Sequence, residues 1–138
     1  MKYINVWENN ETHLDNFIDE RGGIADIFYN ENINHVAIIT SESDSIRGDH
    51  CHRLTTQHTL VIKGELEYWY KPLVSEAAAK FSLLKKGDLV STPPSEIHAL
   101  RAKQYTEFIV FTEGIRGGLD YEKDTYRLSE SIINDGPI

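Results

Sequence analysis

The residue types best suited to chemistry gather in the stretch 47–64, which reads RGDHCHRLTTQHTLVIKG. Within it, His50 and His52 are separated by a single residue. Because side chains alternate between the two faces of a strand, His50 and His52 point to one face and Cys51 to the other. Two imidazoles at this spacing can hold one ion or one small substrate between them. A third histidine, His98, follows downstream, so the function depends on whether the three meet.

Histidines in this pattern are suited to two kinds of chemistry, and the residues alone leave both open. Imidazole has a pKa near ~6.5 and can both remove and return a proton near neutral pH. His50, His52 and His98, with Gln57, could instead coordinate one divalent first-row transition-metal ion. Such a site would be neutral, because no carboxylate completes it. Simple packing in the core is a weaker interpretation, because each buried unpaired imidazole costs roughly 1–3 kcal/mol.

The elements that must position these side chains are strands. The dominant hydrophobic period is two, and Gly and Pro separate many short segments, which is typical of a sandwich or barrel. Two segments, Thr12–Ile18 and Ser75–Lys80, could be helical, although the second reads better as a loop. The expected strands are Tyr3–Trp7, Ile24–Tyr29, His35–Thr40, Ile46–His52, Thr59–Lys63, Glu65–Lys71, Lys80–Leu84, Leu89–Thr92, His98–Ala102, Thr106–Thr112 and Thr125–Leu128.

Turn residues flank the histidine-bearing stretches. Lys63-Gly64-Glu65 predicts a tight hairpin between two strands, and in Lys85-Lys86-Gly87-Asp88 the glycine supplies a positive φ. Pro93 and Pro94 cannot donate to a ladder of hydrogen bonds, so the strand before them ends there. His98 then opens the next strand, which places it near a strand end.

The composition bounds the class of protein. A chain of 138 residues predicts one domain, 1–138, with its core at about 21–128. No apolar run approaches the ~20 residues that span a bilayer, and the polar N-terminus is not a secretory signal. The net charge of −8 argues against nucleic acid as a partner. The single cysteine cannot form an internal disulfide, which fits a cytoplasmic location.

The first histidine stretch resembles the first motif of the cupin superfamily. The resemblance rests on His50-x-His52, four residues, Gln57, six residues and Gly64. In that motif Glu usually stands at the position of Gln57.

The second stretch resembles the second cupin motif. Gly87, five residues, Pro93-Pro94, then Ser95, two residues and His98 follow its spacing, with Ser95 where Gly is usual. Both motifs in this order imply an all-β, single-domain cupin jelly-roll (double-stranded β-helix) barrel with the three histidines inside its open end. We expect a homodimer, since exposed sheet edges are commonly covered by pairing.

Further segments resemble sugar-modifying cupins. Arg47-Gly48-x-His50-x-His52-x4-Gln57 resembles the nucleotide-sugar 3,4-ketoisomerases, in which Gln replaces Glu. Asp19-Glu20-Arg21-Gly22-Gly23 resembles the Asp-x-Arg-Gly segment near the start of those enzymes and of the dTDP-sugar 3,5-epimerases. The segment Leu119–Leu128 resembles the final strand region of such cupins. The chain departs from the ketoisomerases at Val36-Ala37, where they carry an aromatic pair.

The resemblance implies an isomerase or epimerase that acts on a nucleotide-linked keto sugar in cell-surface polysaccharide biosynthesis. His50 and His52 would be the catalytic residues, since moving a carbonyl along a sugar requires proton removal and return. His98 would orient the sugar. Arg21 and Arg47 would bind the diphosphate of the small-molecule substrate.

Two tyrosines are further candidates for substrate contact. Tyr68 and Tyr70 share a strand face and could line the cavity, although aromatics at period two are more often core or dimer interface. Two other functions stay open for the chain as a whole. One is a metal-binding cupin with different small-molecule chemistry, and the other is a non-catalytic cupin that binds a sugar or another ligand.

Overall fold

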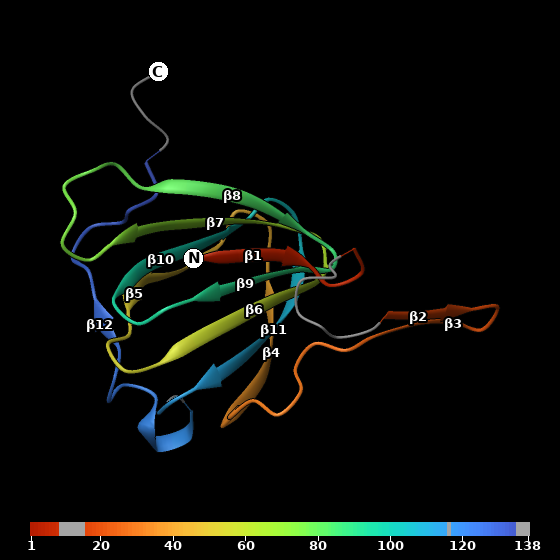
Figure 1. Cartoon of the computed structure of the whole chain (residues 1–138). Helices are drawn as coiled ribbons and strands as arrows, with labels where there is room; N and C mark the ends of the chain where they lie inside the picture. The colour runs from red at the N-terminus through yellow and green to blue at the C-terminus, as the bar shows by residue number, and fades with distance from the viewer. Residues whose placement is uncertain (9–15, 116, 135–138) are drawn as a thin grey trace.

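Two five-stranded antiparallel sheets face each other and enclose the core in the computed structural model (Figure 1). The structure describes residues 1–8, 16–115 and 117–134. The strands are β1 Lys2–Asn5, β2 Asn16–Asp19, β3 Gly22–Ala25, β4 His35–Ser41, β5 Ile46–Cys51, β6 Thr56–Lys63, β7 Glu65–Pro72, β8 Lys80–Lys85, β9 Asp88–Thr92, β10 Glu96–Ala102, β11 Thr106–Glu113 and β12 Tyr126–Arg127, with the 3-10 turn η1 at Gly118–Asp120.

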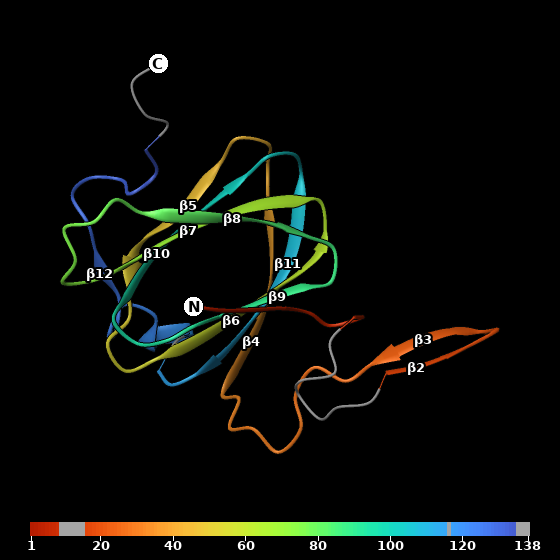
Figure 2. The same ribbon diagram turned by 45° about the horizontal axis from the view of Figure 1, so that its top comes forward.

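The strand order separates the two large sheets cleanly. One sheet has the order β1-β9-β6-β11-β4, and the other has the order β12-β5-β10-β7-β8. A small third sheet, formed by β2 and β3, projects from the body of the molecule in both views (Figures 1 and 2). The prediction of an all-β jelly roll is confirmed.

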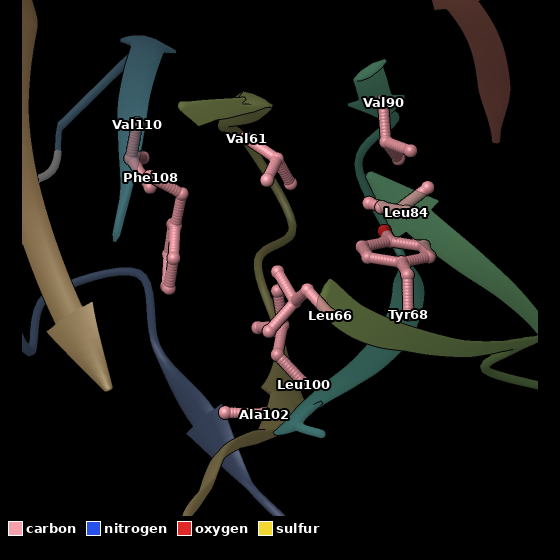
Figure 3. Close-up of a cluster of buried hydrophobic side chains, with 9 residues drawn as sticks. All are labelled: Val61, Leu66, Tyr68, Leu84, Val90, Leu100, Ala102, Phe108 and Val110. Carbon is pink, nitrogen blue, oxygen red and sulfur yellow. The ribbon is translucent and has the colours of Figure 1, made fainter. Parts of the chain in front are cut away.

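Alternation along the strands forms the core between the sheets. In β11, Thr106, Phe108, Val110 and Thr112 are buried, and the residues between them are partly exposed. Apolar side chains from both sheets meet in the interior, as Figure 3 shows. The period-two pattern in the sequence therefore reports directly which face of each strand is inside. The main cluster is Val61, Leu66, Tyr68, Leu84, Val90, Leu100, Ala102, Phe108 and Val110.

The predicted hairpin at Lys63-Gly64-Glu65 is wrong, because β6 and β7 belong to different sheets. β6 pairs with β9 and β11, whereas β7 pairs with β8 and β10. Gly64 has a φ of 97°, and a Cβ there would lie 2.5 Å from a backbone oxygen. The glycine is thus required for a sharp passage from one sheet to the other. A turn residue predicts a reversal but not which strand lies alongside afterwards.

The predicted helix Thr12–Ile18 is wrong over its last part, because Asn16–Asp19 is strand β2, paired with β3. Residues 12–15 lie outside the described residues. The segment 75–80 is a loop that leads into β8, as the alternative interpretation expected. The strand predicted at Ile24–Tyr29 ends at Ala25 and begins at Gly22. Within the described ranges, no helix is long and apolar enough to cross a membrane.

Candidate functional site

His50, His52 and His98 come together in the structure, as the motifs predicted. The ring centroid of His50 lies 4.7 Å from that of His52 and 4.7 Å from that of His98, and the His52 and His98 centroids are 5.3 Å apart. All three side chains are buried. Among the described residues they form the one group of three or more potential metal ligands, with ligand nitrogens within 4.8 Å of one another.

Strand register explains why the cluster forms. His98 on β10 lies directly opposite His50 on β5 and, on its other side, opposite Tyr70 on β7. Arg127 on β12 lies opposite His50 in turn. Side chains that face each other across antiparallel strands share a face of the sheet. Tyr70, His98, His50 and Arg127 therefore form a row on one face, which we name the mouth row.

A β-bulge in β5 decides the position of Arg47. The register shifts between His98 and Ala99, where β5 contains one extra residue, Asp49. Arg47 consequently lies opposite Leu100, on the same face as His50, although an odd spacing of three would otherwise separate them. The bulge needs Gly48, since a Cβ at its φ of 90° would lie 2.8 Å from the His98 carbonyl oxygen.

Backbone carbonyls fix the tautomers of two of the histidines. His52 Nδ1 lies 2.9 Å from the carbonyl oxygen of Asp124, and His98 Nδ1 lies 3.2 Å from that of Glu96. A carbonyl oxygen only accepts, so each Nδ1 carries the proton. The neutral rings then have their lone pairs on Nε2. This is the arrangement that a general base or a metal ligand requires.

Asp124 joins the C-terminal segment to the loop that follows β5. Its carboxylate accepts hydrogen bonds from the Arg53 and Leu54 amides and from the Thr55 hydroxyl. Burial raises the pKa of the Asp124 carboxyl, but these three bonds and the proximity of His52 together lower it below its ordinary value. Asp124 is therefore an ionised, buried anchor that holds the backbone carbonyl against His52.

A cavity of about 310 Å³ opens beside the cluster, at the lower end of ligand-pocket sizes. Its walls are mixed: Leu100, Phe108 and Val110 supply apolar groups, and His50 and Gln57 supply polar groups. Arg47 and Arg127 are the described cations that line it, and Tyr121 lies with them. A concave site in which apolar side chains meet several convergent polar groups has the form of a small-molecule site.

Gln57 has the environment of a ligand-binding residue. It is buried and lines the cavity with His50, and its Oε1 has no hydrogen-bond partner among the described residues. Three imidazoles and one amide oxygen form a donor set that suits a divalent first-row ion. The residues present thus fit the metal that the sequence suggested. Whether an ion or a substrate group takes this position stays a prediction.

The two predicted tyrosines occupy different positions. Tyr68 is fully buried in the main core cluster, with its ring parallel to that of His98 and its hydroxyl bonded to the Thr92 hydroxyl. Burial raises the pKa of Tyr68 far above its ordinary value. Tyr68 is therefore a core residue that lies beside His98, in agreement with the core interpretation. Tyr70 is partly buried in the mouth row.

Of the two predicted diphosphate-binding arginines, the structure brings one to the cavity. Arg47 lines it, and its guanidinium donates to the Ser41 hydroxyl and the Thr40 carbonyl. Arg21 lies on the projecting β2–β3 hairpin, 80% exposed, and is paired with Asp19. It does not line the cavity of its own chain, so its role in substrate binding stays a prediction.

Three residues of the site escaped the sequence analysis: Tyr121, Asp124 and Arg127. All lie in the segment Leu119–Leu128, which the sequence singled out only as a whole. Their signal was weak because β12 has two residues, too few for a periodic pattern. The strand-to-strand pairing of Arg127 with His50 could not be deduced from spacing.

Comparison with known proteins agrees with this architecture. A dTDP-4-dehydrorhamnose 3,5-epimerase from Sulfolobus tokodaii matches with a TM-score of 0.72 at 19% identity, over 89% of this chain and 77% of that one. A 3,4-ketoisomerase from Helicobacter canadensis matches with 0.71 at 18%, over 91% and 89%. A variant of the ketoisomerase QdtA from Thermoanaerobacterium thermosaccharolyticum, in complex with TDP-4-keto-6-deoxyglucose, matches with 0.68 at 17%, over 83% of each chain.

The fold is a cupin-like jelly roll, the fold that these epimerase and ketoisomerase structures share. No curated protein sequence matches the chain significantly. A family model described as the polysaccharide biosynthesis C-terminal domain matches residues 17–115. The chain belongs to that family.

Proposed function

We propose that this chain isomerises or epimerises a nucleotide-linked keto sugar in polysaccharide biosynthesis, with His50 and His52 as the proton-transfer groups. The observation that carries the proposal is the buried cluster of His50, His52 and His98 beside a cavity of ligand size. The family and the fold support it, since structurally similar proteins are a 3,5-epimerase and 3,4-ketoisomerases.

The geometry suits removal of a proton next to a carbonyl. His52 presents Nε2 as the basic nitrogen, because Asp124 holds the proton on Nδ1. When the ring takes a second proton, the nearby Asp124 carboxylate stabilises the imidazolium, as the attraction between the two groups indicates. The ring centroid of His50 lies 4.7 Å from that of His52, so His50 is close enough to return a proton at a neighbouring carbon.

A second candidate is metal-assisted chemistry at the same position, favoured by the orphaned Oε1 of Gln57. His50, His52, His98 and Gln57 would hold the ion, which would polarise the carbonyl of a bound substrate as a Lewis acid. In that case these residues act as ligands, and proton transfer falls to another group or to solvent.

Deuterium exchange tests the proposal directly. Enzyme is incubated in D₂O with TDP-4-keto-6-deoxyglucose, and incorporation next to the carbonyl is followed by NMR or mass spectrometry. We expect His50→Gln or His52→Gln to slow exchange by roughly 10²–10⁴-fold while nucleotide binding is retained. His58→Gln is the matched control, because His58 lies on β6 in the other sheet and contacts Ser91 and Glu113 instead.

The same experiment separates the alternatives. Exchange that survives EDTA supports the metal-free pair, whereas exchange that EDTA abolishes and an added ion restores assigns the role to a metal site. If no keto-sugar nucleotide exchanges at saturating concentration, the proposed activity is wrong for this ligand class. A binding domain would then be the remaining interpretation for these ligands.

A further inference from the structure

We propose that Arg127 is a substrate-binding residue that takes the diphosphate of the nucleotide at the mouth of the cavity. The identity of the anion rests on the proposed function. The placement of Arg127 rests on the structure alone: it stands directly opposite His50 in the β5–β12 register and lines the cavity beside His50.

Along the mouth row, the side chains become more exposed from the histidines to Arg127. A substrate with an uncharged sugar and a charged diphosphate fits this order. His98 and His50 are 0% and 5% exposed, whereas the side chain of Arg127 is 52% exposed on the short edge strand β12. The reacting sugar would lie against the histidines. Its charged end would then extend toward Arg127, where water still solvates the phosphate oxygens. The row would thus place the sugar at its buried end and the diphosphate at its exposed end.

The local charge also favours an anion at this position. The chain carries a net charge of −8, so the protein as a whole repels a diphosphate. Two guanidinium groups, those of Arg47 and Arg127, nevertheless line the same cavity, from strands β5 and β12. Guanidinium donates in a planar fork that matches phosphate oxygens, which makes arginine well suited to this contact.

The ion pair of Arg127 with Glu122 can be exchanged at little cost. Arg127 Nη2 lies 2.6 Å from Oε1 of Glu122, whose side chain is 62% exposed. An ion pair between exposed side chains contributes little to stability because water screens it. Glu122 therefore holds Arg127 in place when the cavity is empty, and a phosphate can take over its hydrogen bond.

Isothermal titration of the full chain tests this assignment, with TDP, inorganic pyrophosphate and thymidine as probes. We expect Arg127→Gln to weaken TDP binding by about tenfold to a hundredfold, as for the loss of a charge-assisted hydrogen bond. The salt dependence of TDP binding should decrease as well, since one contact between charges is lost. Lys123→Gln is the matched control, because this substitution also removes one positive charge from the same segment. Lys123 pairs with Asp120 and does not line the cavity.

Several outcomes overturn the proposal. It fails if Arg127→Gln and Lys123→Gln bind TDP equally, if thymidine binds wild type as tightly as TDP, or if wild type binds neither TDP nor pyrophosphate at millimolar concentration. A thermal melt shows that each variant is folded. The proposed activity is judged separately by deuterium exchange. If the chain binds TDP through Arg127 but shows no exchange, the proposed activity is wrong and the binding site is still supported.

Discussion

The cavity and the β2–β3 hairpin each carry an arginine from a segment that resembles a motif of sugar-modifying cupins, yet the two arginines are held in place differently. At the mouth, Arg47 is placed by a bulge, by Gly48 and by pairing on both sides of β10. Within the described part of the chain, the hairpin makes ladder bonds only between its own two strands, and Phe17, Ile18 and Ile24 are 55%, 71% and 61% exposed.

The difference shows that a motif names a residue but packing positions it. A two-stranded hairpin is at best marginally stable alone in water. The mouth row crosses four strands of one sheet and rests on a core that includes Tyr68 and Leu100. Substitutions in the two regions should therefore have unequal effects.

The largest contrast should be in stability. Leu66→Ala removes a side chain that is 1% exposed in the main cluster, and we expect the free energy of unfolding to fall by about 2–5 kcal/mol. Phe17→Ala removes an exposed side chain and should change it by less than about 0.5 kcal/mol. Urea unfolding followed by tryptophan fluorescence measures both. Equal losses would show that a partner covers the hairpin in solution.

The next contrast concerns two aspartates with lowered pKa values, the buried Asp124 beside His52 and Asp19 on the hairpin. A carboxyl whose pKa is lower in the folded state stabilises the fold above its unfolded pKa of about 3.9, and this contribution is lost as pH falls through the folded pKa. We expect Asp124→Asn to lower stability at pH 7 by about 1–3 kcal/mol and to flatten its dependence on pH between 7 and 3.

Asp19→Asn is the control for this titration. Asp19 owes its lowered pKa to hydrogen bonds with Arg21 on an exposed turn, where water screens the pair. Its contribution to stability is therefore small, and the acid-unfolding curve of Asp19→Asn should stay close to that of wild type. The interpretation of Asp124 as an anchor fails if its variant retains the slope of wild type.

Metal affinity sharpens the description of the mouth itself. Gln57→Glu adds an anionic ligand to a neutral donor set, and we expect a divalent first-row ion such as Zn²⁺ to bind at least about tenfold more tightly. Gln104→Glu, on an exposed turn, adds the same charge elsewhere and should leave the affinity unchanged. Competition titration with a chromogenic chelator measures both. Unchanged or weaker binding by Gln57→Glu would remove Gln57 from the site.

The smallest effect is expected at Arg21. Its guanidinium bonds to Asp19 and does not line the cavity of its own chain, so Arg21→Gln should change TDP affinity by less than about twofold. The comparison with Arg127→Gln is direct, because both variants lose one positive charge. A tenfold loss in Arg21→Gln would show that the hairpin reaches the cavity of a second copy, and the affinity would then depend on protein concentration.

The sequence by itself determined which residues share a face over short distances. Alternation placed His50 and His52 together and Cys51 on the other side, where it is buried. The prolines ended β9 at Thr92, and Gly87 adopted the expected positive φ. These features depend on the geometry of a few adjacent residues, which a pattern reports faithfully.

Only the tertiary structure decided the relations between distant strands. Period two alone would place Arg47 and His50 on different faces of β5, and the bulge at Asp49 brought them to the same face. Arg127 joined the site because β12 pairs with β5, and Gly64 marked a change of sheet where a hairpin was expected. The physical reason is that register and sheet membership are set by packing among many strands, whereas periodicity records only whether a side chain faces inward or outward.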